Sequence, residues 1–104
     1  MKKSNSYSSR YQQDLISEYL SKGAIILDVR TYSERERGYI SGSKHIEMRD
    51  IPFHAEILKK LNKPIIVVCA GGVRSKEVAK HLEFIGVDII NGGPWQNVEN
   101  LMVA

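Results

Sequence analysis

The sequence contains a single cysteine, Cys69, among its 104 residues. A lone cysteine excludes an internal disulfide framework, and it also excludes zinc or iron–sulfur sites that need several cysteine ligands. The thiol is therefore either a small buried side chain or a reactive group.

Long hydrophobic runs are also missing. No apolar stretch approaches the roughly 20 residues that a membrane-spanning helix requires. The residues after Lys2 and Lys3 are polar, unlike those of a secretory signal. We therefore expect a cytoplasmic protein without membrane contact. No motif points to a cofactor, and the histidines His45, His54 and His81 lack metal-ligand spacing, so they are expected to be structural or surface groups.

Most of the chain has no surplus of one charge sign. The net charge is +3, and residues 1–13 carry three basic side chains and no acidic one, which leaves 12 of each sign on the rest. A basic tail on a neutral body does not form the patch that nucleic acids require, so no nucleic-acid partner is expected. Residues 1–9 are predicted to form a flexible arm. Residues 10–104 have the length and composition of one globular domain.

Apolar runs alternate with segments of helical periodicity along the chain. The expected strands cover residues 24–29, 45–47, 65–69 and 87–90. The expected helices lie around residues 15–20, 31–37, 52–61, 75–85 and 95–102. Strands that alternate with helices indicate an α/β fold with a mainly parallel central sheet and helices on both faces.

Three local patterns give more specific expectations. Thr31, followed three residues later by Glu34, is the pattern of a capped helical turn. The segment 91–94, Asn-Gly-Gly-Pro, is typical of a turn. The buried face of the third helix is expected to contain Ile57, Leu58 and Leu61.

The segment after the third expected strand carries the strongest chemical signal. Cys69 ends that strand, and ligands of parallel sheets bind beyond the carboxyl ends of the strands. A loop with Gly71 and Gly72 can turn successive backbone N–H groups inward. The helix that Ser75 is expected to start directs its positive end to the same place. Arg74 adds a charge that can bind an oxyanion through two hydrogen bonds.

Each of these residues also has a purely structural interpretation. A cysteine after an apolar run is often a small buried side chain. Arg74 could be a surface cation, although a cation is unfavourable at the start of a helix. Ser75 could cap the helix without contacting the sulfur, or it could cap the helix with a hydroxyl that also contacts the sulfur. The combination of cysteine, paired glycines, arginine and a helix start within seven residues favours a reactive thiol in an anion-binding loop.

Cysteine phosphatases use a related loop that is one residue longer and has a histidine before the cysteine. Here four residues separate Cys69 from Arg74, and Val68 precedes the cysteine. A tighter loop suits one sulfur atom better than a tetrahedral phosphate. The order of strand, Cys-x-x-Gly-x-Arg-Ser and helix at residues 69–75 resembles that of the single-domain rhodaneses, a family of sulfurtransferases.

Two further motifs carry the same resemblance in the same order. Asp-Val-Arg at residues 28–30, followed by Glu34, resembles the upstream motif of the family, and Asn-Gly-Gly-x-Trp at residues 91–95 resembles its closing motif. The resemblance covers residues 12–102 and implies a small rhodanese-like α/β domain. It also implies that Asp28 anchors loop backbone and that Arg30 is an ion-pair partner that holds the scaffold.

The resemblance further implies a two-step sulfur transfer. Cys69 takes the sulfane sulfur of a donor such as thiosulfate, and the resulting persulfide passes it to cyanide, a thiol or a protein cysteine. Arg74 is expected to bind the donor. The backbone groups that would hold the sulfur belong to Ala70, Gly71, Gly72, Val73 and Ser75.

Three other functions stay open from the sequence. A persulfide carrier in a sulfur relay would use the same cysteine with little small-molecule turnover. A non-catalytic binding module and a phosphatase fit the intact loop less well. Because no second cysteine is present, the sulfur must leave to an external acceptor. The chain is expected to be a monomer or a weak homodimer.

Overall fold

Four parallel strands form the centre of the structure, a computed structural model that describes residues 9–102. The strands lie in the order β2-β1-β3-β4, so β3 has a neighbour on each side. Their bounds are β1 (Ile25–Asp28), β2 (Lys44–His45), β3 (Ile65–Cys69) and β4 (Ile89–Pro94). The predicted parallel sheet is confirmed.

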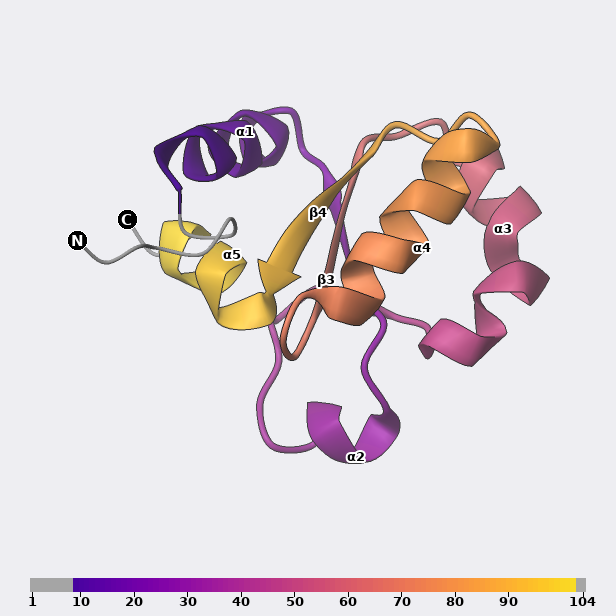
Figure 1. Cartoon of the computed structure of the whole chain (residues 1–104), viewed down its shortest axis with the longest axis horizontal. Helices are drawn as coiled ribbons and strands as arrows, with labels where there is room; N and C mark the ends of the chain where they lie inside the picture. Colours follow the sequence, from indigo (N-terminus) through magenta and orange to yellow (C-terminus); the bar gives the residue numbers. More distant parts are fainter. Residues whose placement is uncertain (1–8, 103–104) are drawn as a thin grey trace.

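Helices cover both faces of this sheet (Figure 1). Their bounds are α1 (Arg10–Ser21), α2 (Tyr32–Arg35), the 3-10 helix η2 (Met48–Asp50), α3 (Ile51–Lys60), α4 (Val73–Phe84) and α5 (Trp95–Met102). α3 and α4 pack on one face, and α1 and α5 pack on the other. The α/β architecture with helices on both faces is therefore confirmed.

Strand β3 is buried over its full length because the two cores meet along it. Ile65, Val67 and Cys69 point into the core under α3 and α4, whereas Ile66 and Val68 point into the core under α1 and α5. Alternation along a strand sends successive side chains to opposite faces. A strand covered on both sides must be apolar at every position, which explains the unbroken run.

The segment 91–94 was predicted as a turn, and that prediction is wrong. These residues belong to β4, and its pairing with β3 slips at this point, so that Val67 pairs with Asn91 but Val68 pairs with Gly93. A β-carbon on Gly92 would lie 2.7 Å from a methyl of Ile66. The glycine therefore allows close packing inside a strand rather than a chain reversal.

The buried face of α3 also differs from the prediction. Leu58 is buried, but Ile57 and Leu61 are 60% and 39% exposed. The helix begins one residue before Pro52, which occupies its first turn as expected. The face that contacts the core instead contains Ile51, Ala55 and Leu58, at the spacing of one side of a helix.

Two helix starts show their caps directly. Ser9, which was predicted to belong to the N-terminal arm, caps α1 and accepts a hydrogen bond from the backbone of Gln12 at 3.1 Å. The rest of that predicted arm lies outside the described residues. Thr31 and Glu34 form the reciprocal capping box predicted for α2. Over residues 9–102, each helix is too short or too polar to cross a membrane.

Candidate active site

Cys69 lies at the carboxyl end of β3, and its side chain is fully buried. The chain then turns back at Gly72, which has the left-handed φ of 98° that an L-residue rarely adopts. Through this turn the backbone N–H of Gly72 donates to the Cys69 Sγ at 2.9 Å. The N–H of Ser75 donates to the same sulfur at 3.3 Å. Two converging N–H groups therefore face the sulfur from one side.

Ser75 was predicted to cap α4, and that prediction is wrong. The helix starts at Val73, with Gly72 as its N-cap residue, so Ser75 stands inside the first turn and is fully buried. The left-handed turn at Gly72 allows the helix to begin two residues earlier than expected. The thiol of Cys69 donates to the Ser75 Oγ at 3.2 Å, and the Ser75 hydroxyl donates to the carbonyl of Gly72 at 3.2 Å.

The remaining loop residues form the outer rim of this turn. Ala70 and Gly71 are exposed, and the side chain of Val73 is 73% exposed. The side chain of Asn91 reaches the loop from β4, with its Nδ2 3.5 Å from the carbonyl of Gly72. The turn around the sulfur is thus supported by both α4 and β4.

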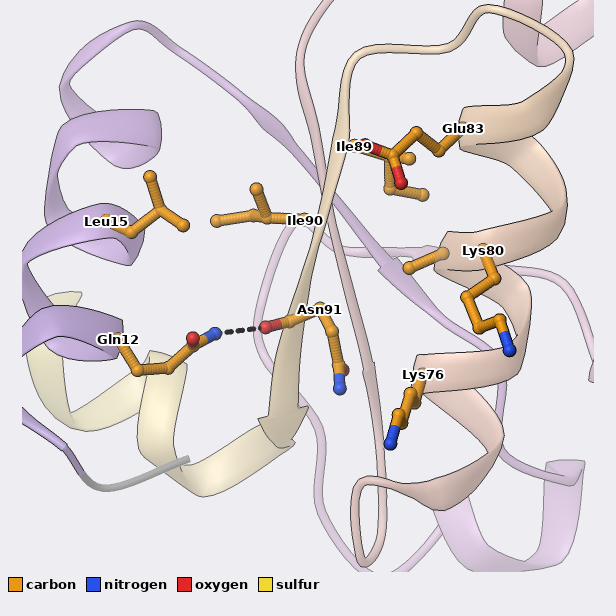
Figure 2. A pocket seen from close by; sticks show the side chains of 9 residues that line it. Gln12, Leu15, Lys76, Lys80, Glu83, Ile89, Ile90 and Asn91 are labelled. Carbon is orange, nitrogen blue, oxygen red and sulfur yellow. Dashed lines mark hydrogen bonds between the residues drawn. The ribbon is translucent and has the colours of Figure 1, made fainter. Parts of the chain in front are cut away.

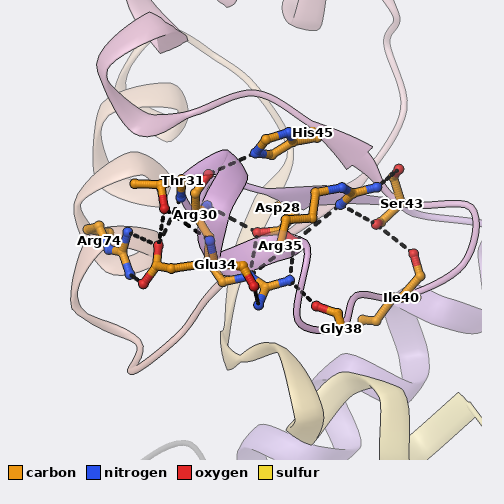
Figure 3. Close-up of polar contacts among 10 residues, drawn as sticks. All are labelled: Asp28, Arg30, Thr31, Glu34, Arg35, Gly38, Ile40, Ser43, His45 and Arg74. Carbon is orange, nitrogen blue, oxygen red and sulfur yellow. Dashed lines mark hydrogen bonds and ion pairs between the residues drawn. The ribbon is translucent and has the colours of Figure 1, made fainter.

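Arg74 is held by Glu34, forty positions away on α2. The two terminal nitrogens of Arg74 donate to the two carboxylate oxygens of Glu34 at 2.8 and 2.9 Å (Figure 3). Hydrogen bonding from Arg74 lowers the pKa of Glu34 to about 2, and the bond from the Thr31 backbone adds to this effect. The same pairing raises the pKa of Arg74 above its usual range. The sequence had indicated Glu34 as part of a capped turn and of the upstream motif, but not as a partner of Arg74.

Asp28, near this pair, is a buried carboxylate. Arg30 donates to both oxygens of Asp28 through its side chain and to one of them through its backbone N–H at 3.0 Å. Burial opposes ionisation, but the bonds from Arg30 and the charges of Arg30 and Arg35 outweigh it, so the pKa of Asp28 is lowered. Arg35 of α2 lies 3.2 Å from the same carboxylate.

Arg30 contacts three other parts of the fold, two through its side chain and one through its backbone carbonyl. Its guanidinium donates to the carbonyl of Gly38 at 2.7 Å and lies 4.8 Å from the ring of Trp95. Its own carbonyl lies 2.8 Å from Nε2 of His45 (Figure 3). Arg30 therefore connects the ends of β1 and β2 with the start of α5, beside the loop that contains Cys69.

A groove follows the open edge of β4, between α1 and α4 (Figure 2). It has a volume of about 360 Å³ and is bordered by Lys76 and Lys80 of α4. On the opposite side, Gln12 of α1 donates to the backbone carbonyl of Asn91. Within residues 9–102, no three His, Cys, Asp or Glu side chains come close enough together to hold a metal ion.

Comparison with known proteins gives consistent matches. The putative sulfurtransferase YtwF of Bacillus subtilis (strain 168) is 38% identical over 66 residues, which are 64% of this chain and 63% of that protein. The thiosulfate sulfurtransferase GlpE of Ectopseudomonas mendocina (strain ymp) is 34% identical over 82 residues, 73% of this chain and 72% of that protein. The chain thus spans less than two thirds of the length of the Bacillus relative.

Solved structures and a family model show a similarity to the same kind of protein. A crystal structure of a rhodanese-like domain protein from Staphylococcus aureus superposes with a TM-score of 0.69 at 39% identity, covering 83% of this chain and 85% of that one. A family model described as the rhodanese-like domain matches residues 12–97. These residues include both the Asp-Val-Arg motif at residues 28–30 and the whole loop at residues 69–75. The chain therefore belongs to the family of rhodanese-like domains, which includes sulfurtransferases among its members.

Proposed function

We propose that this protein is a sulfurtransferase that moves sulfane sulfur from a donor such as thiosulfate to a thiophilic acceptor through a persulfide on Cys69. The observation that carries the proposal is the environment of the Cys69 sulfur. Two backbone N–H groups donate to the Cys69 Sγ at the positive end of α4. Such donors stabilise a negatively charged sulfur without a metal ion or a general base.

In the first step, the Cys69 thiolate attacks the outer sulfur of thiosulfate. A new S–S bond forms to Cys69, the S–S bond of thiosulfate breaks, and its electron pair leaves with sulfite. The negative charge then rests on the terminal sulfur of the persulfide. We assign the holding of that charge to N–H groups of the turn from Ala70 to Ser75, of which those of Gly72 and Ser75 already donate to the Cys69 Sγ.

In the second step, a nucleophile such as cyanide or a thiolate attacks the terminal sulfur. The bond between the two sulfurs breaks, and the electron pair returns to Cys69 as a thiolate, so the protein ends unchanged. Because Cys69 is the sole cysteine of the chain, no internal thiol can resolve the persulfide. The acceptor must therefore come from outside the chain.

The charged residues around the loop are assigned donor-binding and supporting roles. Arg74 is proposed to bind the oxyanion of the donor, since its guanidinium retains N–H groups that Glu34 does not occupy. Asp28 and Arg30 are proposed to hold the scaffold rather than to contact substrate, since both are buried and engaged with each other.

A second candidate is a persulfide carrier that receives sulfur from a partner protein in a relay. The ion pair between Arg74 and Glu34 favours this candidate, because a neutralised arginine attracts the thiosulfate dianion less strongly. A carrier should turn over thiosulfate slowly but should accept sulfur rapidly from a cysteine desulfurase. A catalytic sulfurtransferase should turn over thiosulfate at a rate comparable with its loading by the desulfurase.

Formation of thiocyanate from thiosulfate and cyanide tests the proposed activity. The native protein should produce thiocyanate, and Cys69→Ser should reduce production to the uncatalysed rate while it retains the fold. If Cys69→Ser keeps the native rate, transfer through a Cys69 persulfide is excluded.

A further inference from the structure

The guanidinium of Arg74 is already committed to a carboxylate beside the proposed sulfur site. Both of its terminal nitrogens bind Glu34, in the two-pronged geometry that makes arginine–carboxylate pairs strong. The pair is partly exposed, with 32% of the Arg74 side chain and 37% of the Glu34 side chain accessible. A donor that approaches the loop therefore meets the negative charge of Glu34 together with the positive charge of Arg74.

Glu34 is fixed in this position by contacts of its own. Its Oε1 accepts hydrogen bonds from the backbone N–H of Thr31 at 2.8 Å and from the Thr31 hydroxyl at 3.2 Å (Figure 3). Because hydrogen bonding from Arg74 lowers the pKa of Glu34 to about 2, this carboxylate is ionised at neutral pH and remains so into the acidic range. Its negative charge is therefore a permanent feature of the surroundings of Arg74.

The other cationic side chains near the loop do not supply the positive charge that Glu34 offsets at Arg74. Arg30 and Arg35 both point at the buried carboxylate of Asp28. Lys76 borders the groove along β4, on the side of α4 that faces Asn91 (Figure 2). The charge state of the Arg74–Glu34 pair therefore sets how strongly the loop attracts an anionic donor.

Resting on the proposed function, we infer that Glu34 determines donor specificity: it offsets the charge of Arg74 and so disfavours the thiosulfate dianion relative to sulfane donors that carry one negative charge. Thiosulfonates and the persulfides of thiols belong to the favoured class. Removing the carboxylate charge should therefore help thiosulfate more than it helps a monoanion, because a dianion feels twice the Coulomb interaction.

Two donors that differ chiefly in charge test this inference. Thiosulfate and methanethiosulfonate present the same kind of sulfane sulfur, and attack by the Cys69 thiolate releases sulfite from the first and methanesulfinate from the second. The variant Glu34→Gln removes the charge, while the glutamine carbonyl can still accept the hydrogen bond from the Thr31 backbone and keep the cap of α2.

The measured quantity is the ratio of kcat/KM for thiosulfate to kcat/KM for methanethiosulfonate. In Glu34→Gln this ratio should rise about three- to tenfold, as expected for removing one charge close to a partly exposed site. Glu34→Asp keeps the charge and should keep the ratio near the native value. Glu36→Gln makes the same change of net charge at an exposed position of the same turn and should leave the ratio unchanged.

The outcomes separate the inference from the function on which it rests. An equal change for both donors, or a falling ratio in Glu34→Gln, overturns the specificity role and leaves only a structural one. Native protein that takes sulfur from neither donor overturns the proposed function, and the specificity role with it.

Discussion

The backbone N–H of Gly72 donates to the sulfur of Cys69, only three positions earlier in the chain, at 2.9 Å. This contact depends on the φ of 98° at Gly72, which places the following helix start directly beside the end of β3. The shape of the sulfur site is therefore set by one backbone angle that glycine adopts without strain.

Replacement of Gly72 by alanine should disturb this contact. An L-residue in the left-handed region costs about 1–2 kcal/mol, so the free energy of unfolding should fall by about that amount, and sulfur loading should slow about tenfold or more as the donors shift. Chemical denaturation and single-turnover loading measure the two effects. Gly71→Ala, whose β-carbon would meet no atom within 4 Å, should leave stability within about 0.5 kcal/mol. Unchanged loading in Gly72→Ala would contradict the assigned role of this turn.

The same angle explains why part of the site could not be predicted from the sequence. Strand β3 could be predicted, since five consecutive apolar residues fit a strand covered on both faces. The start of α4 could not, because the positive φ of Gly72 moves the helix start from Ser75 to Val73. Sequence spacing placed Ser75 at the N-cap of the helix, whereas the structure places it inside the first turn; of the two alternatives for its hydroxyl, contact with the sulfur is the one observed.

Replacement of Arg74 by alanine should chiefly weaken donor binding. Loss of a charge-assisted contact costs about 1.5–3 kcal/mol, so the KM for thiosulfate should rise about 10- to 100-fold with a smaller change in kcat. Steady-state kinetics with thiosulfate measure the two constants. Arg37→Ala removes the same charge from an exposed position and should leave the KM unchanged. Native KM values in Arg74→Ala would remove the role of Arg74 in donor binding.

The pairing of Arg74 with Glu34 could not be predicted from the sequence. The residues lie forty positions apart, and each is a charged residue in a polar local segment. Only the packing of α2 beside the loop brings them together. The capping box was readable from Thr31 and Glu34 because both partners lie within one turn of helix. Contacts between distant polar residues leave no such local pattern.

The ion pair of Glu34 should also make stability depend on pH. Its folded pKa of about 2 lies below the ordinary value of 4.5, so the pair contributes stability above pH 4.5 and loses it as the pH falls towards 2. The difference in free energy of unfolding between native protein and Glu34→Gln should therefore shrink over that range. Urea denaturation at a series of pH values measures it. A difference that does not vary with pH would show that the carboxylate charge is not its source.

Replacement of Gly92 by alanine should destabilise the fold without changing the chemistry. The added β-carbon would lie 2.7 Å from a methyl of Ile66 and 2.8 Å from a methyl of Val98, both in the core under α1 and α5. Such overpacking costs about 1–3 kcal/mol. Thermal and chemical denaturation measure the loss, and the folded fraction should keep its sulfur-loading rate. A variant as stable as the native protein would show that β4 can shift away from this contact.

Intact-mass spectrometry after incubation with thiosulfate, and separately with a small-molecule persulfide, tests the proposed Cys69 persulfide most directly. The native protein should gain the mass of one sulfur atom, lose it again when cyanide or a thiol is added, and show no gain in the Cys69→Ser variant. An unchanged mass with both donors would contradict sulfur transfer through Cys69.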